Sequence, residues 1–316
     1  MFKIFLLLLL PALTFAQISL ESVDELLKQK QYSKAEGILV LYVANHASNL
    51  RALELLGDAY GYQRKWDEAI DVYESLVEAN NNSANYHYKY AGVLAMKALD
   101  NKLSALGYIG AIKYSFEKAA TLDKNHIDVR WALVEFYMEL PGILGGSIKK
   151  SFAYAQELED LSKVDGYLAK GYIYEYTDEP QLAEKYYKMA ITEGGSIVCY
   201  DKLTKFYEAE AKPKQAIKNI EYAQKKHQRN ALHYQIGKVA AEYNVELHKG
   251  EQCLHKYLGN YSAKDGVPKA WAYYRLAQIE THKKNKTKAL KYINLAVTAL
   301  PEIETFWKQK EVILEM

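Results

Sequence analysis

The sequence predicts an all-α protein, a right-handed α-solenoid of about eight antiparallel helix pairs that ends in a capping helix. Apolar residues make up 49% and charged residues 25% of the 316 residues, enough apolar side chain for a packed core. Only 6 Pro and 17 Gly argue against an all-β chain with many turns. A fixed interval between small residues then favours one repeat array over two ordinary domains.

The first residues have the pattern of a secretory signal peptide. Lys3 supplies an early positive charge, residues 4–10 are an unbroken apolar run, and Thr14-Phe15-Ala16 ends in a small residue. The apolar run is shorter than the roughly 20 residues that a helix needs to span a bilayer. We therefore expect cleavage after Ala16, so that 1–16 is removed, and an exported mature chain without a membrane span. The periplasm is the expected compartment, with secretion as the alternative.

A set of small and bulky residues recurs four times along the chain. In each set a small residue is followed 12 residues later by Ala, and a bulky residue stands four residues after that Ala. The sets are Gly57/Ala69/Tyr73, Gly171/Ala183/Tyr187, Thr204/Ala216/Ile220 and Ala277/Ala289/Ile293. Offsets of three, four and seven residues mark one helix face, and the interval of 12 contains a short break. Each set therefore predicts two antiparallel helices whose axes approach closely at the small residues.

Weaker copies of the pattern fill the rest of the chain. They are expected at 23–44, 86–123, 129–161 and 233–258. Together these units extend the array over 17–301, and 302–316 is predicted as a helix that caps the apolar side of the last pair.

Three departures from the regular spacing predict local irregularities. A longer interval between Leu94 and Ile112 predicts extended helices or an extra loop around 98–107. The run Pro141–Ser147 predicts a tight interhelix loop, and 260–268 predicts a longer connection.

The best-conforming unit resembles the tetratricopeptide repeat family. Its signature residues are Leu56, Gly57, Tyr60, Ala69 and Tyr73. Together with the signal peptide, the pattern is similar to exported bacterial members of that family. The resemblance implies stacked helix pairs, a concave surface lined by the first helix of each pair, and non-catalytic binding of a protein or peptide partner.

Tyrosine is the preferred aromatic residue of the chain, with 28 Tyr against 8 Phe and 4 Trp. Rings with a polar tip suit peptide capture, although many of these rings are expected to fill space between helices. Carried over by position in each unit, the resemblance places seven aromatic residues in the groove. They are Tyr62, Trp131, Tyr172, Tyr176, Tyr234, Trp271 and Tyr274. Charged neighbours of mixed sign accompany them: Arg51, Asp58, Asp201, Lys205 and Lys238.

The function predicted from this pattern is an exported scaffold that holds a protein or peptide segment in an aromatic-lined groove. An accessory subunit of an envelope transport or assembly system is the alternative. An enzyme is disfavoured because no catalytic signature appears, and no cofactor is implied.

Other candidate sites have simpler interpretations. His248, Glu251 and His255 have helical spacing suited to a metal, but Lys249 and Lys256 beside them oppose a cation, and no metal site is predicted. The net charge of +2 and the predicted export disfavour nucleic acid as a partner. The basic clusters at 225–229 and 282–288 fall at expected helix ends, where cations are favoured. Cys199 and Cys253 are expected to be small buried thiols.

Overall fold

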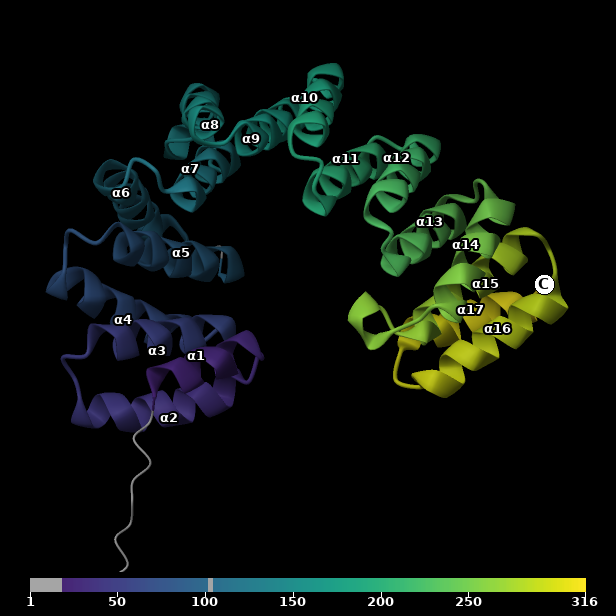
Figure 1. Cartoon of the computed structure of the whole chain (residues 1–316), viewed down its shortest axis with the longest axis horizontal. Helices are drawn as coiled ribbons and strands as arrows, with labels where there is room; N and C mark the ends of the chain where they lie inside the picture. Colours follow the sequence, from purple (N-terminus) through teal and green to yellow (C-terminus); the bar gives the residue numbers. More distant parts are fainter. Residues whose placement is uncertain (1–18, 102–104) are drawn as a thin grey trace, which may run out of the picture. The chain divides into compact units, whose positions relative to one another are not determined.

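The computed structural model describes residues 19–101 and 105–316, which fold into helices (Figure 1). In this part of the chain there are 17 α-helices, two short 3-10 helices and no strands, which confirms the predicted all-α solenoid of helix pairs. The predicted cleavage after Ala16 lies outside the described residues. The chain divides into two compact units between Ser147 and Ile148.

The first unit contains three helix pairs and a seventh helix. Its elements are α1 (Leu20–Lys28), α2 (Tyr32–Asn45), α3 (Leu50–Tyr62), α4 (Trp66–Ala79), α5 (Ala84–Asp100), α6 (Ala105–Leu122), α7 (Ile127–Glu139) and the 3-10 helix η1 (Gly142–Leu144). The extended helices expected in the third pair are present, since α5 has 17 and α6 has 18 residues.

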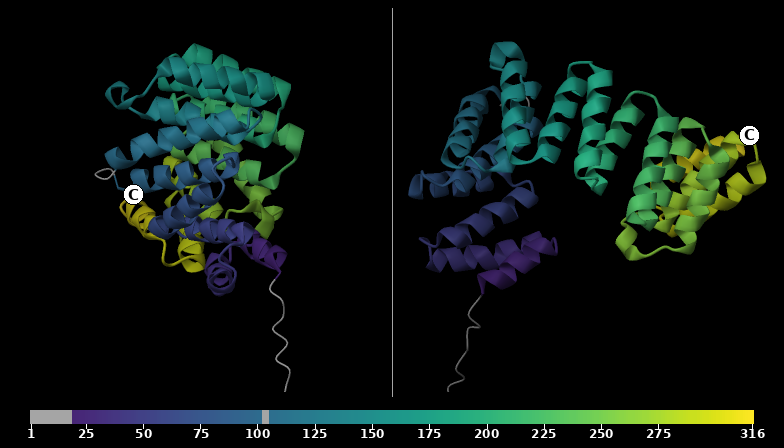
Figure 2. Two further views of the ribbon diagram at one scale, coloured as in Figure 1. Left: turned by 90° about the vertical axis from the view of Figure 1, so that its left-hand side faces the viewer. Right: turned by 45° about the horizontal axis from the view of Figure 1, so that its top comes forward.

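The second unit begins with α8, so the two helices of the expected fourth pair belong to different units. Its elements are α8 (Ile148–Leu161), α9 (Lys163–Tyr176), α10 (Pro180–Glu193), α11 (Ile197–Ala209), α12 (Pro213–His227), α13 (Asn230–Tyr243), α14 (Leu247–Gly259), η2 (Ala263–Asp265), α15 (Lys269–His282), α16 (Lys286–Ala299) and α17 (Glu304–Leu314). Figure 2 shows the yellow C-terminal helices packed together, as their shared core requires.

The turn inside the regular pairs has the same backbone geometry each time. One non-glycine residue takes a left-handed conformation, as Arg64 (φ 60°), Asp178 (φ 59°) and Lys284 (φ 58°) do. The following amide donates to a carbonyl five residues back, as in Lys65 N to Tyr60 O at 3.0 Å. This is the hydrogen bond of a Schellman-type helix end. Each of these left-handed residues lies seven positions after the small residue of its unit, so the interval of 12 does contain the predicted turn.

The two helices of a pair approach each other so closely that only a small residue fits at the contact. A Cβ added at Gly57 would lie 2.7 Å from the Tyr73 ring, and one at Gly171 would lie 2.6 Å from the Tyr187 ring. Both tyrosines are buried. The ring of the second helix therefore occupies the volume that a side chain on the first helix would need.

The predicted capping helix corresponds to α17. Its Phe306 and Ile313 are fully buried in one cluster with Ala277 and Ile293 of the last pair. At the expected tight loop, η1 is followed by Gly145 with φ 102°, a conformation that favours glycine.

Candidate partner-binding surface on the first helices

The first helix of each regular pair presents a stripe of side chains at fixed positions. Residues three before, one after and five after the small residue are four apart, so they lie on one helix face. We call this face the first-helix stripe. In α3 it consists of Glu54, Asp58 and Tyr62, and in α9 of Leu168, Tyr172 and Tyr176.

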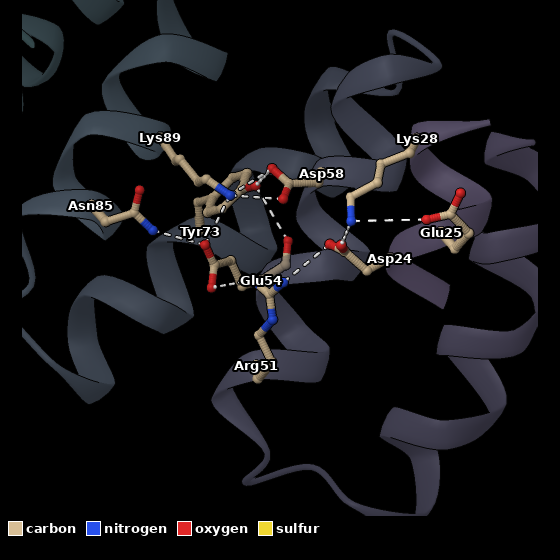
Figure 3. A network of polar contacts seen from close by, with 9 residues as sticks. All are labelled: Asp24, Glu25, Lys28, Arg51, Glu54, Asp58, Tyr73, Asn85 and Lys89. Atoms are coloured by element: carbon tan, nitrogen blue, oxygen red, sulfur yellow. Dashed lines mark hydrogen bonds and ion pairs between the residues drawn. The ribbon is translucent and has the colours of Figure 1, made fainter. Parts of the chain in front are cut away.

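In the first unit, charges on α1, α3 and α5 form a network across the helices (Figure 3). Lys89 Nζ on α5 lies 2.7 Å from an Asp58 oxygen and 2.9 Å from a Glu54 oxygen, both on α3. Arg51 Nη1 lies 3.1 Å from Glu54, and its Nη2 lies 3.2 Å from Asp24 on α1. Because Arg51 and Lys89 each lie beside carboxylates of a neighbouring helix, most of the charge cancels within the network.

The environment of Glu54 and Lys89 favours the charged forms of both. Burial by itself would raise the pKa of Glu54, but the ammonium of Lys89 and further hydrogen bonds hold that pKa below its ordinary value. Burial would likewise lower the pKa of Lys89, but Asp58 and Glu54 hold it above its ordinary value. The Tyr73 hydroxyl donates to Asp58 at 2.5 Å, and burial raises the pKa of this tyrosine. The network is thus ionised near neutral pH and largely compensated.

The second unit repeats this arrangement on different helices. Lys238 Nζ on α13 lies 3.5 Å from Glu208 on α11 and 3.6 Å from Glu242 on its own helix. Arg275 Nη2 on α15 lies 2.7 Å from Glu242. We call both networks charge ladders. Sequence reasoning noticed charges of mixed sign here but missed the pairing, which opposite charges at matching positions of successive first helices could have indicated.

Two of the predicted aromatic residues are well exposed at equivalent positions. Tyr62 and Tyr176 lie five residues after Gly57 and Gly171, at the ends of α3 and α9, and are 59% and 52% exposed. The Tyr62 ring stacks on Tyr32 at a centroid distance of 4.8 Å. The Tyr176 ring lies 6.3 Å from that of the half-buried Tyr172. Each unit therefore presents a pair of rings that includes one exposed tyrosine.

Two other predicted residues are not exposed, which corrects the expectation that their rings project freely. Tyr234 and Tyr274 are only 7% exposed. They lie three residues before the small residue, where the Tyr234 ring packs 5.4 Å from Tyr257 and the Tyr274 ring 5.2 Å from Phe306. The next helices of the array cover this end of the stripe and leave its other end open.

The two predicted tryptophans are half-buried. Trp271 packs against Phe306 at 4.9 Å and Trp131 lies on α7. Binding of a partner by any of the seven aromatic residues stays a prediction.

The remaining sequence candidates have structural partners. Glu251 contacts Lys283, and no group of three or more His, Cys, Asp or Glu suited to a metal occurs in the described residues. Cys199 and Cys253 are buried free thiols, as predicted.

Two segments of the chain, residues 52–84 and 272–302, match models of the tetratricopeptide repeat. The chain therefore contains tetratricopeptide repeats. Its fold is similar to that of a tetratricopeptide repeat protein from Parabacteroides merdae, with 13% identity, a TM-score of 0.50, and coverage of 93% of this chain and 97% of that one. No curated protein matches the chain significantly.

Two further solved structures are similar to this tetratricopeptide array. The C-terminal part of a repeat-containing protein from Cytophaga hutchinsonii is 14% identical, with a TM-score of 0.47 and coverage of 92% of this chain and 99% of that one. YrrB, described as a tetratricopeptide repeat protein with an unusual peptide-binding site, is 17% identical, with a TM-score of 0.42 and coverage of 62% and 97%.

The tetratricopeptide repeats support a protein-interaction scaffold, a role that is typically non-catalytic. Within residues 19–101 and 105–316, no helix combines the length and apolar character needed to cross a membrane.

Proposed function

We propose that this tetratricopeptide protein is an exported, non-catalytic scaffold that holds a segment of a partner protein against its first helices. The observation that carries the proposal is that an exposed tyrosine recurs at the same position of two helix pairs, as Tyr62 in α3 and Tyr176 in α9. Exposed rings at equivalent positions contribute little to either core, whereas rings at an interface commonly supply its binding energy.

The charge ladders support an aromatic rather than an ionic basis for recognition on this surface. The carboxylates of Glu54 and Glu242 are already paired with Lys89 and Arg275. A partner would have to displace these internal pairs to use them, at the cost of leaving a partly buried charge uncompensated. Tyr62 and Tyr176 can contact a partner without that loss.

Site-specific photo-crosslinking in the producing cells tests this surface. A photoreactive phenylalanine analogue replaces Tyr62 or Tyr176 in the full chain, and the matched control places it at the exposed Leu295 of α16. We expect the two stripe positions to capture the same discrete protein and position 295 not to capture it. Equal capture from all three positions, or no product from either stripe position, would contradict the proposal.

Export is proposed from the pattern of residues 1–16 alone. We expect N-terminal sequencing of the protein recovered from its natural compartment to begin at Gln17. Recovery of the chain with Met1 in place from the cytoplasmic fraction would contradict it, without affecting the crosslinking result.

A further inference from the structure

A groove with a different chemical character lies on the second helices of the second unit. Helices α10 and α12 form its walls and α11 forms its floor, and it encloses about 870 Å³. The His227 ring, at the end of α12, donates from Nε2 to Gly195 O in the α10–α11 turn at 2.8 Å. This bond ties one wall of the groove to the turn that follows the other. We call it the α10–α12 groove.

The charge of the α10–α12 groove is strongly unbalanced. Its lining includes four lysines but a single carboxylate, Glu184. That carboxylate accepts from Lys188 at 2.5 Å and from the Tyr207 hydroxyl at 2.9 Å. The other three lysines, Lys218, Lys225 and Lys226, form no ion pair with a carboxylate in the described part of the chain. The charge ladders differ in this respect, because there every central cation has a carboxylate partner.

The groove also presents aromatic and apolar surface between its charges. Tyr222 is 55% exposed, and Lys218 Nζ lies 5.9 Å from the centre of its ring. The side chains of Leu203 and Tyr207, from α11, form part of the floor. A ligand that fits would therefore place anionic groups against the lysines and an apolar or aromatic group over Tyr222.

We propose that the α10–α12 groove binds an acidic segment of a partner protein, in which several carboxylates flank an aromatic or apolar side chain. Complementary charge across an interface speeds association and selects the partner, and three uncompensated ammonium groups supply it here. This site is separate from the first-helix stripe, so it extends the proposed function to a second contact.

A protein segment fits these features better than other anionic partners. A flat bilayer surface cannot reach the floor of a groove that lies between two helices. A nucleic acid is drawn by a broad positive field, whereas the whole chain carries 41 basic against 39 acidic residues.

Fluorescence anisotropy with a defined probe tests the proposal. The probe is a labelled twelve-residue peptide in which Glu alternates with Ser around one central Tyr, and the matched probe carries Gln in place of every Glu. We expect the full mature chain to bind the Glu peptide at least about tenfold more tightly than the Gln peptide at about 50 mM salt. The double variant Lys218→Glu/Lys225→Glu should weaken binding of the Glu peptide by at least about tenfold.

Control variants separate the groove from net charge. Lys291→Glu/Lys308→Glu changes the net charge equally on exposed lysines of α16 and α17 and should bind as the unmodified chain does. Lys218→Arg/Lys225→Arg keeps the charge and should retain binding, and thermal unfolding of each variant checks its fold.

Four results would overturn the proposal. They are no binding of the Glu peptide, equal binding of both peptides, equal loss in the α16 and α17 control, or a groove-dependent preference for oligo-dT or phosphatidylserine vesicles over the peptide. None of these results bears on crosslinking at Tyr62 or Tyr176, so the two proposals fail separately.

Discussion

At the scale of single residues, the regular pairs depend on a small residue that faces a ring. Gly57 faces the Tyr73 ring so closely that an added Cβ would overlap it, whereas the nearest atom to a Cβ at Gly61, one turn later in α3, would be 3.9 Å away. Two glycines of the same helix therefore have different roles. Gly57 permits close approach of α4, and Gly61 has room for a methyl group.

The contrast between these glycines gives the first prediction. Gly57→Ala should destabilise the protein by about 1–3 kcal/mol, because the methyl group must displace the Tyr73 ring. Gly61→Ala should be neutral or stabilise by up to about 1 kcal/mol, because Ala favours the helix. Urea unfolding of both variants measures the difference. Equal changes in unfolding free energy for the two substitutions would show that helix propensity, and not the contact with Tyr73, sets the effect of Gly57→Ala.

The second prediction concerns Lys89 and the pH dependence of stability. At neutral pH, Lys89→Met should cost about 1–3 kcal/mol, because it removes the cation that pairs with both Glu54 and Asp58 and leaves Glu54 with Arg51 alone. The folded-state pKa of Glu54 lies below its ordinary value of 4.5. Its contribution to stability is therefore complete above about pH 4.5 and is lost as the pH falls through the folded-state pKa.

Removal of Lys89 takes away the largest of the interactions that hold the pKa of Glu54 down, so this pKa should rise in the variant. The stability difference between the unmodified chain and Lys89→Met should thus narrow as the pH is lowered below about 4.5. Chemical unfolding across this range measures it, with the exposed Lys34→Met as control. If the stability difference between the unmodified chain and Lys89→Met stays constant with pH, Lys89 contributes through packing and not through its charge.

At the scale of elements, α17 completes the core of the last pair. The Tyr274 ring of α15 stacks on Phe306 of α17 at 5.2 Å, and Trp271 contacts the same ring at 4.9 Å. A tyrosine that sequence reasoning assigned to a groove therefore helps to attach the capping helix. Its exposed counterpart on α9, Tyr176, has no such neighbour in its own stripe beyond Tyr172.

The third prediction compares these two tyrosines. Tyr274→Ala should destabilise the second unit by about 3–5 kcal/mol and increase proteolysis at α17, because it leaves a cavity beside Phe306. Tyr176→Ala should change stability by no more than about 0.5 kcal/mol, because its ring is half exposed. Thermal unfolding with limited proteolysis distinguishes them. Similar stability of the two variants would place Tyr274 among the free surface rings after all.

At the scale of the whole molecule, each of the two compact units is an array in which a helix packs mainly on the helices next to it in the chain. The buried residues form separate clusters along the chain, such as one around Leu39 and Leu55 and another around Ile293 and Phe306. In such an array stability is a sum of local contributions, so damage should remain near its origin.

The fourth prediction tests this locality with Ala183 of α10, which is fully buried. Ala183→Leu should overpack the contact between α9 and α10 and cost about 1–3 kcal/mol. Hydrogen exchange should accelerate in α9 to α12 and stay unchanged in α1 to α6. The exposed Lys185→Leu on the same helix serves as the control. A uniform acceleration across both units would contradict local coupling.

The irregular segments show which departures from the regular repeat the spacing of residues could predict. The intervals around residues 98–107 and 260–268 indicated longer helices and a longer connection, which appear as α5, α6 and η2. The sequence pattern did not indicate that α7 and α8 belong to different compact units. That division depends on how many neighbours each helix packs against, which local spacing does not specify.

The sequence by itself determined the helix pairs, because the interval of 12 between small residues and the turn within it are local and recur with the repeat. It also determined which tyrosines fill the pairs, such as Tyr73 and Tyr187 opposite Gly57 and Gly171. Only the tertiary structure decided that Tyr62 and Tyr176 are exposed while Tyr234 and Tyr274 are buried. These residues lie on the equivalent face of four different helices. Their exposure depends on which part of that face the neighbouring helices cover. The pairing of Lys89 with Glu54 likewise depends on the distance between neighbouring helices, which packing sets and a single sequence does not record.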